Sequence, residues 1–120
     1  MGYALLGMVI EKVTGEPYEA FLARELLAPL GMRDSSFYFT SQSTDQRLAM
    51  GYVGIGVEQA AVSLRLRAAG QFTTTANDMG IFLAFLLGDG EIDGHPFVRR
   101  DLMLQLARPS TTKASQAGLM

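Results

Sequence analysis

The 120-residue sequence contains no cysteine and a single histidine, His95, and these absences exclude several kinds of site. Without cysteine the chain has neither disulfides nor thiolate metal ligands. One histidine cannot build a histidine-rich metal site, so we expect no metal and no cofactor. The net charge is −2, and the densest basic cluster is only Arg99 and Arg100, which argues against a nucleic-acid partner.

Long hydrophobic runs are also missing, although 48% of the residues are hydrophobic. The two most apolar stretches, 1–10 and 79–88, fall short of the roughly 18 residues that a membrane span needs, so no membrane span is expected. The first stretch lacks the basic start and the small-residue cleavage site of a signal peptide. The sequence therefore leaves the localisation unknown. We interpret both stretches as helices buried on most sides, with more apolar surface than so short a chain covers.

The first thirty residues predict two helices. Residues 3–14 carry apolar side chains at the spacing i, i+3, i+4, i+7, namely Leu6, Val9, Ile10 and Val13. Gly7 inside this helix suggests a close neighbour, and Gly15 suits a left-handed C-terminal turn. A second helix is predicted over 17–28, with Pro17 in its first turn and Pro29 as its stop. Its expected apolar face comprises Tyr18, Phe21, Leu22 and Leu26.

The middle of the chain has weaker periodicity. Residues 35–40 and 47–54 are predicted as short strands, and the polar stretch 41–46 between them as a loop. Residues 57–68 fit neither period.

A third helix is predicted to begin at Thr75 and to end at about Leu87. Thr75 and Asp78 have the spacing of a capping box, in which each side chain caps the other's backbone N–H. Gly88, Asp89 and Gly90 would end the helix. The following residues, 88–96, read as a turn-rich connection. A last helix is predicted over 98–107, with one apolar face formed by Val98, Leu102 and Leu106.

Two patterns suggest chemistry but are explained more simply. Ser110 and Lys113 form a literal S-x-x-K, the spacing of a serine nucleophile and its base in one group of hydrolases. The lysine of such a pair needs burial to lower its pKa, and residues 109–120 form a polar C-terminal tail. We therefore interpret this pair as part of an exit segment. His95, between a glycine and a proline, is interpreted as a surface residue of a turn.

An acidic alternation at Asp89, Glu91 and Asp93 resembles part of a calcium loop. The remaining ligands and the terminal glutamate of such a loop are missing, so a solvated acidic turn is expected.

Three ordered stretches resemble one family, the beta-lactamase-related serine hydrolases. Residues 2–37 resemble its pattern G-Y-x-L-L-G-x-V-I-E-x-V-T-G-x-P-Y followed by P-L-G-M. Residues 68–87 resemble A-G-G-L-x-S-T-A-x-D-M, with departures at Gln71 and Gly80. Residues 90–109 resemble the loop and helix that follow. The family includes class C beta-lactamases, D,D-peptidases and related esterases.

The resemblance implies a fold class that is mainly α with short strands, the helical region of a beta-lactamase/transpeptidase-like α/β fold. It also implies what is missing. The family's S-x-x-K lies upstream of the first stretch, its Tyr-x-Asn directly before it, and its Lys-Thr-Gly or His-Thr-Gly strand downstream. None of the four tyrosines is followed by x-Asn. Residues 1–120 are therefore expected to be a single partial domain, the helical middle segment of a larger one.

The resemblance predicts a fragment of a serine hydrolase that acts through an acyl-enzyme on beta-lactams, D-alanyl peptides or simple esters, and that is inactive alone. No catalytic residue is assigned. Gly70, Gln71 and Phe72 are candidates for the substrate-pocket wall; alternatively, they merely lead into the helix that begins at Thr75. The expected partners are a small acyl substrate in the parent enzyme and the missing flanking segments, or self-association through exposed apolar faces. The competing hypothesis is a stand-alone helical binding module without catalytic activity.

Overall fold

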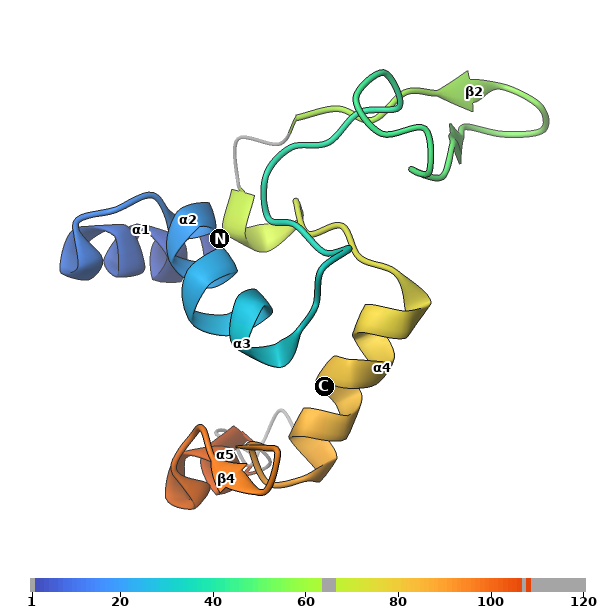
Figure 1. Ribbon diagram of the computed structural model, residues 1–120. Helices are drawn as coiled ribbons and strands as arrows, with labels where there is room; N and C mark the ends of the chain where they lie inside the picture. The colour runs from blue at the N-terminus through green and yellow to red at the C-terminus, as the bar shows by residue number, and fades with distance from the viewer. Residues whose placement is uncertain (1, 64–66, 107, 109–120) are drawn as a thin grey trace. The chain divides into compact units, whose positions relative to one another are not determined.

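A computed structural model describes residues 2–63, 67–106 and 108 (Figure 1). In chain order its elements are α1 (Gly2–Thr14), α2 (Tyr18–Leu22), the π-helical turn η1 (Ala23–Leu27), α3 (Ala28–Leu30), β1 (Gly51–Tyr52), β2 (Glu58–Gln59), the 3-10 turn η2 (Arg67–Ala69), α4 (Ala76–Leu87), β3 (Glu91–Ile92), β4 (His95–Pro96) and α5 (Arg100–Leu106). The chain is mainly helical with short strands, as predicted. No helix within the described ranges is long and apolar enough to cross a bilayer.

The chain divides into two compact units, Met1–Ile81 and Phe82–Met120, with the boundary inside α4. Each unit has its own small set of contacts. The core of the larger unit includes Leu27 and Met32, and that of the smaller includes Phe85.

Helix α1 confirms the first predicted helix. It ends where expected, because Gly15 adopts a left-handed conformation (φ 76°) and its N–H bonds the Glu11 carbonyl at 2.9 Å. Gly7 is buried, and a Cβ at this position would lie 2.6 Å from the Cβ of Ala68 in η2. The backbone of α1 therefore packs directly against η2, which explains why the helix tolerates a glycine in its interior.

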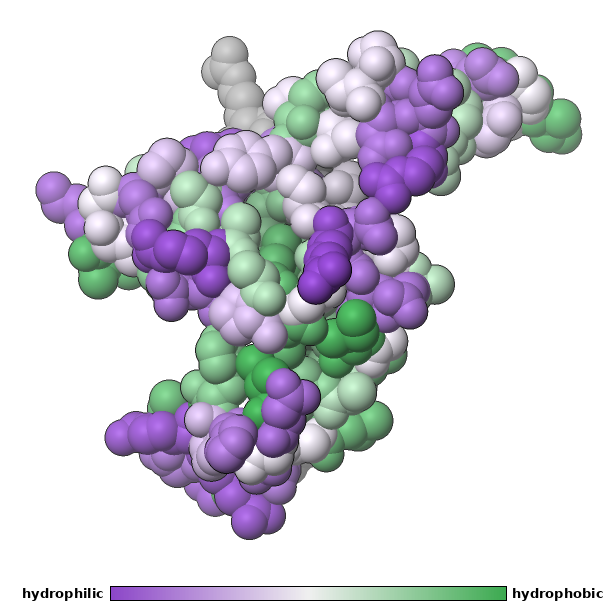
Figure 2. All heavy atoms as spheres, in the orientation of Figure 1, coloured by the Kyte–Doolittle hydropathy of each residue, from purple (hydrophilic) through white to green (hydrophobic). Residues whose placement is uncertain are grey.

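The expectation that the first apolar stretch is buried on most sides is wrong. Leu6, Val9 and Val13 are all exposed, the last of them to 80%. Helix α1 packs on α2 and η2 along the side that carries Gly7, and nothing else in the described residues covers the stripe on its other side. Apolar atoms, drawn green, are visible on the surface in Figure 2. The apolar stretch inside α4 is buried only in part, at Phe85.

The second predicted helix is three shorter segments, α2, η1 and α3, and it continues past the predicted stop. Pro17 precedes it as an extended N-cap residue (ψ 138°) instead of lying in its first turn. Pro29 falls in the first turn of α3, where a missing N–H is tolerated after the π-helical turn. The helical run ends instead at Gly31, which is left-handed (φ 75°).

The two predicted strands are only partly realised. Ser36 and Thr73 form an isolated antiparallel bridge in which each N–H bonds the other's carbonyl at 2.9 Å. Within 47–54 only β1 is a strand, and it pairs antiparallel with β2, in register Gly51 to Gln59. The unassigned stretch 57–68 thus contains β2 and the start of η2.

An aromatic cluster lies beside this bridge. The ring of Phe37 meets that of Tyr18 edge-on at 5.5 Å and that of Phe72 at 4.6 Å. Burial raises the pKa of the Tyr18 hydroxyl, with a smaller contribution from the carboxylate of Glu19. The cluster joins α2 to the segment that precedes α4, and aromatic pairs of this kind stabilise beyond the area they bury.

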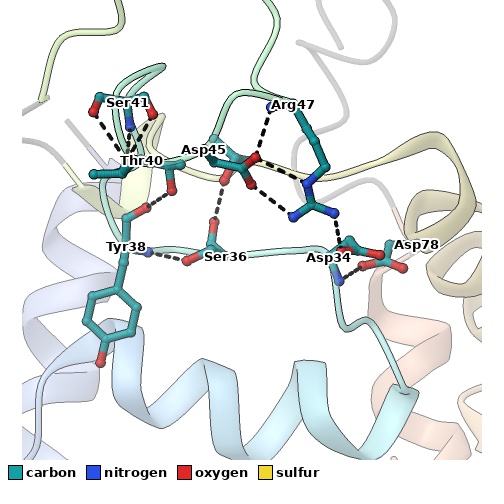
Figure 3. Close-up of polar contacts among 10 residues, drawn as sticks. Asp34, Ser36, Tyr38, Thr40, Ser41, Asp45, Arg47 and Asp78 are labelled. Atoms are coloured by element: carbon teal, nitrogen blue, oxygen red, sulfur yellow. Dashed lines mark hydrogen bonds and ion pairs between the residues drawn. The ribbon is translucent and has the colours of Figure 1, made fainter.

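Half of the predicted capping box is present. The N–H of Asp78 bonds the Thr75 hydroxyl at 3.2 Å, so Thr75 caps α4 as expected. The Asp78 carboxylate does not return the bond. It accepts instead from the N–H of Asp34 at 2.8 Å (Figure 3). It also accepts from the hydroxyl of Ser35 at 2.7 Å. The residue is 2% exposed, and it joins two segments far apart in the sequence.

In the smaller unit, α4 ends as predicted. Gly88 N–H bonds the Ala84 carbonyl at 2.8 Å, and Gly90 is left-handed. The connection that follows is more regular than expected, because β3 and β4 form an antiparallel hairpin. Asp93 and Gly94 at its turn both have positive φ, the conformation that an Asp-Gly pair favours in two-residue hairpin turns.

The predicted face of the last helix is wrong at its two leucines, whereas Val98, which precedes the helix, is half-buried beside Gly90. Leu102 and Leu106 are exposed, while Met103 is more buried and lies against Gly90, where a Cβ would meet its side chain at 2.8 Å. Helix α5 is also shorter than predicted, at Arg100–Leu106. Within the smaller unit the rings of Phe85 and Phe97 pack edge-on, with their centroids 6.0 Å apart.

Two helical glycines give opposite predictions for the same substitution. Gly7→Ala is expected to lower the free energy of unfolding by about 1–3 kcal/mol, because the new methyl overlaps Ala68. Gly80→Ala, where no atom lies within 4 Å of the added Cβ, is expected to raise it by about 0.5–1 kcal/mol. Urea unfolding of both variants measures the pair. Equal shifts of one sign would contradict the packing of α1 on η2.

Asp78→Ala is expected to lower the free energy of unfolding by about 1–3 kcal/mol, because it removes the buried acceptor of the Asp34 N–H and of the Ser35 hydroxyl. The control is Asn77→Ala, an exposed neighbour in the same turn, with an expected change within about 0.5 kcal/mol. Thermal or urea unfolding compares the two variants. A similar small change in both would show that Asp78 does not anchor the start of α4.

Candidate functional site

A cavity of about 410 Å³ lies within the larger unit. Four stretches line it, 39–42, 48–52, 59–62 and 70–73. The last of these contains the predicted pocket-wall residues Gly70, Gln71 and Phe72, all of which line the cavity. The size is that of a small-molecule site.

One amide side chain holds the wall of the cavity formed by residues 48–52 and 59–62, here called the far wall. Gln42 donates from Nε2 to the Ala49 carbonyl at 3.2 Å and accepts at Oε1 from the Ala61 N–H at 3.1 Å. Gln42 therefore links the stretch before β1 to the stretch after β2. Between them, the hairpin is closed by a bond from Val53 N–H to the Val57 carbonyl at 2.8 Å. Nothing in the sequence pattern signals these long-range amide bonds.

The wall of the cavity formed by residues 70–73, here called the near wall, is held by two ion pairs of Arg67 in the preceding turn η2. Arg67 bonds Glu19 at 2.6 Å and Glu11 at 2.9 Å, and Glu11 also accepts from the Tyr18 N–H at 3.1 Å. Burial lowers the pKa of the Arg67 guanidinium, but the two carboxylates outweigh it and leave the pKa raised. These contacts tie η2 to α1 and α2, and Gly70 follows η2 directly.

Glu19 is the buried carboxylate of this cluster. Its side chain is 3% exposed, and one of its two oxygens, Oε2, has no hydrogen-bond partner among the described residues. A buried carboxylate is stabilised chiefly by its ion pair, and removal of the cation would leave it uncompensated. Arg67 is therefore a structural residue of the near wall, and sequence reasoning did not single it out.

A second polar group surrounds a smaller hollow of about 200 Å³. Arg47 bonds Asp34 at 2.7 Å and Asp45 at 2.9 Å (Figure 3). Hydrogen bonds that the Arg47 guanidinium donates to these carboxylates raise its pKa, and the bonds from the Arg47 side chain and backbone N–H lower the pKa of the Asp45 carboxyl. All three side chains are substantially solvent-accessible, so the pairs contribute little to stability.

Ser35 is the one serine close to a carboxylate in this region, but its surroundings do not activate it. Its hydroxyl bonds Asp78 at 2.7 Å and lies 2.8 Å from the Thr74 hydroxyl. A nucleophilic serine needs a base such as histidine or a neutral lysine beside it, and no such side chain bonds Ser35 in the described residues. Ser35 therefore has the geometry of an anchor for α4.

The other residues singled out from the sequence are not brought together. His95 is exposed in β4, and its ring bonds no described residue. Asp89 pairs with Arg100 at 3.1 Å. Across the described ranges, no three acidic, histidine or cysteine side chains are grouped so that they could hold a metal. Ser110 and Lys113 lie outside the described residues, as does the whole tail 109–120.

Comparisons with known proteins agree on one family. A sequence model of the family described as Beta-lactamase matches residues 1–120. Human "Putative beta-lactamase-like 1" is 33% identical over 92 residues, which is 75% of this chain and 18% of that protein. "Putative penicillin-binding protein PbpX" of Bacillus subtilis is 31% identical over 94 residues, 75% of this chain and 24% of that protein.

A solved structure agrees with these sequence matches. The octameric penicillin-binding protein homologue from Pyrococcus abyssi superposes with a TM-score of 0.67 at 26% identity, over 89% of this chain and 24% of that one. The chain thus spans about a quarter, or less, of the length of the relatives it matches. Because the family model matches every residue, the chain belongs to the beta-lactamase family, a family of serine hydrolases.

Proposed function

We propose that this chain is the helical middle region, residues 1–120, of a serine hydrolase that acts through an acyl-enzyme on beta-lactams, D-alanyl peptides or simple esters. On its own it is inactive. One observation carries the proposal: the family's stretches are present in order, while its Tyr-x-Asn and Lys-Thr-Gly or His-Thr-Gly motifs are absent from the sequence. Its only literal S-x-x-K, at Ser110 and Lys113, stands after those stretches instead of before them.

The missing motifs are the ones that do the chemistry. A serine oxygen attacks the acyl carbon while lysine and tyrosine side chains move its proton, and backbone N–H groups stabilise the oxyanion. Water then cleaves the acyl-enzyme. The described residues offer a serine beside a carboxylate, Ser35 and Asp78, but no histidine or lysine that bonds this serine and could take its proton. The role that we propose for the described residues is therefore to support the substrate.

Within that enzyme, Gly70, Gln71 and Phe72 form part of the wall of the substrate pocket. Their position in the lining of the 410 Å³ cavity supports this role. The ion pairs of Arg67 and the Ser36–Thr73 bridge hold this wall from both ends. A pocket wall must keep its shape when a ligand enters, and these contacts supply that rigidity.

The exposed stripe of α1 supports the view that this region works with other segments. Leu6, Val9 and Val13 present a continuous apolar surface on one helix face. The flanking segments of the full enzyme are the proposed cover, and self-association is the second way to cover it; the relative from Pyrococcus abyssi is octameric. The same stripe is also what a stand-alone helical binding module would use to dock a partner.

The purified chain is expected to hydrolyse neither a chromogenic beta-lactam nor a p-nitrophenyl ester above the buffer background, because no described serine is paired with a base. Absorbance assays at several chain concentrations measure this. Ser110→Ala is the matched control, and it should leave the background unchanged. Turnover that scales with the chain and disappears in Ser110→Ala would overturn the proposal of an inactive region.

Dye binding separates this proposal from the binding module. The chain is expected to bind the apolar dye ANS strongly at native pH, because the α1 stripe is uncovered. A Val9→Lys/Val13→Lys variant should bind less dye, since it charges the stripe without touching the Gly7 side of the helix. Cooperative thermal unfolding with no dye binding by the unmodified chain would instead favour a self-sufficient module.

A further inference from the structure

The cavity described above differs from the surface around it in one respect: none of the described residues that line it carries a charge at neutral pH. Phe39, Leu48, Val62 and Phe72 supply apolar surface, and the polar lining consists of hydroxyls and amides. Charged residues make up 18% of the whole chain. None of them is contributed to the lining by any of the four stretches.

Most charged residues next to the lining stretches form ion pairs with other charged side chains. Asp45 and Arg47 lie between two lining stretches and are bonded together, with Arg47 also bonded to Asp34. Arg67, before the last stretch, is bonded to two glutamates. Glu58 neighbours the lining residue Gln59, but successive strand residues point to opposite faces.

Most polar groups of the lining are also already engaged. Both ends of the Gln42 amide bond the backbone, and the Thr73 hydroxyl donates to the Ser36 carbonyl at 3.3 Å. The Tyr52 hydroxyl and the Gln59 amide line the cavity and have no hydrogen-bond partner among the described residues. Both are neutral donors of the kind that bonds the carbonyl oxygen of an ester or amide.

We propose that this cavity binds the uncharged acyl part of a substrate, an alkyl or aryl chain with its carbonyl group, and rejects a carboxylate or an ammonium there. The inference rests on the proposed function, and it narrows the substrate class on this side of the site to neutral acyl groups. The physical reason is that an ion entering the cavity loses part of its water and gains no counter-ion from the lining, whereas a neutral amide of the same shape pays a much smaller penalty.

Two probes of equal size test the proposal, hexanamide and sodium hexanoate at neutral pH. The ¹⁵N-labelled full chain is titrated with each, and the amide shifts of Gly70 and Thr73 report binding at the cavity wall. Hexanamide is expected to bind roughly tenfold tighter or more, since the anion loses much more favourable hydration on entry than the neutral amide does. Hexanoate binding that equals or exceeds hexanamide binding would overturn the proposal and show that a cation reaches the cavity.

A charge placed in the wall should reverse the preference. Ala60 lines the cavity, and Ala60→Lys is expected to raise hexanoate affinity and lower hexanamide affinity. Ala28→Lys is the matched control, an exposed alanine in α3 that does not line the cavity, and it should leave the hexanamide preference unchanged. If the amide spectrum shows that Ala60→Lys is unfolded, Gln59→Lys in the exposed strand β2 makes the same test.

The outcomes separate this inference from the proposed function. Failure of both probes to shift the wall amides would remove the cavity as a ligand site, and with it the pocket-wall role of Gly70, Gln71 and Phe72. Binding of both probes without preference would keep the pocket wall and overturn only the neutral-acyl specificity. A preference that Ala60→Lys and Ala28→Lys alter equally would also overturn it, because the discrimination would not arise in the cavity.

Discussion

The buried carboxylate of Asp78 is the interaction on which the larger unit depends. It accepts hydrogen bonds from Asp34 and Ser35, residues 44 and 43 positions away in the sequence, at the first turn of α4. An acidic group there also faces the positive end of the helix dipole. Once this contact is fixed, Ser36 lies beside Thr73, and the bridge between them sets the direction of the cavity wall. The geometry of the cavity wall therefore depends on contacts made at the first turn of α4.

Local structure could be predicted from the sequence where a single residue determines the backbone conformation at a helix end. Gly15 ended α1, Thr75 capped α4, and Gly88 to Gly90 ended it, because left-handed turns and hydroxyl caps depend on neighbours within four residues. The Asp-Gly pair at Asp93 and Gly94 is a hairpin signal, although the composition of residues 88–96 predicts only a turn-rich connection. The strands of this hairpin are only two residues long, too short to show an alternating pattern.

Long-range contacts did not follow, for physical reasons. The Asp78 carboxylate bonds a backbone N–H and a hydroxyl, and Arg67 bonds two glutamates. No periodicity marks which of several acids an arginine will meet. The near wall at Gly70 to Phe72 was found through family resemblance, whereas the far wall has no signal because Gln42 holds it by backbone bonds. Periodicity identified the α1 stripe, and the inference that this stripe is buried failed because a pattern cannot show whether a partner is present.

The central claim is that these helices are one region of a larger serine hydrolase. The uncovered stripe of α1 and the uncharged lining of the cavity are the observations that led us to propose a supporting role for this region in that enzyme. The sequence of the gene upstream of the Met1 codon tests this most directly. The account predicts an in-frame Ser-x-x-Lys followed, just before Met1, by Tyr-x-Asn. An open reading frame upstream that encodes neither motif would contradict it.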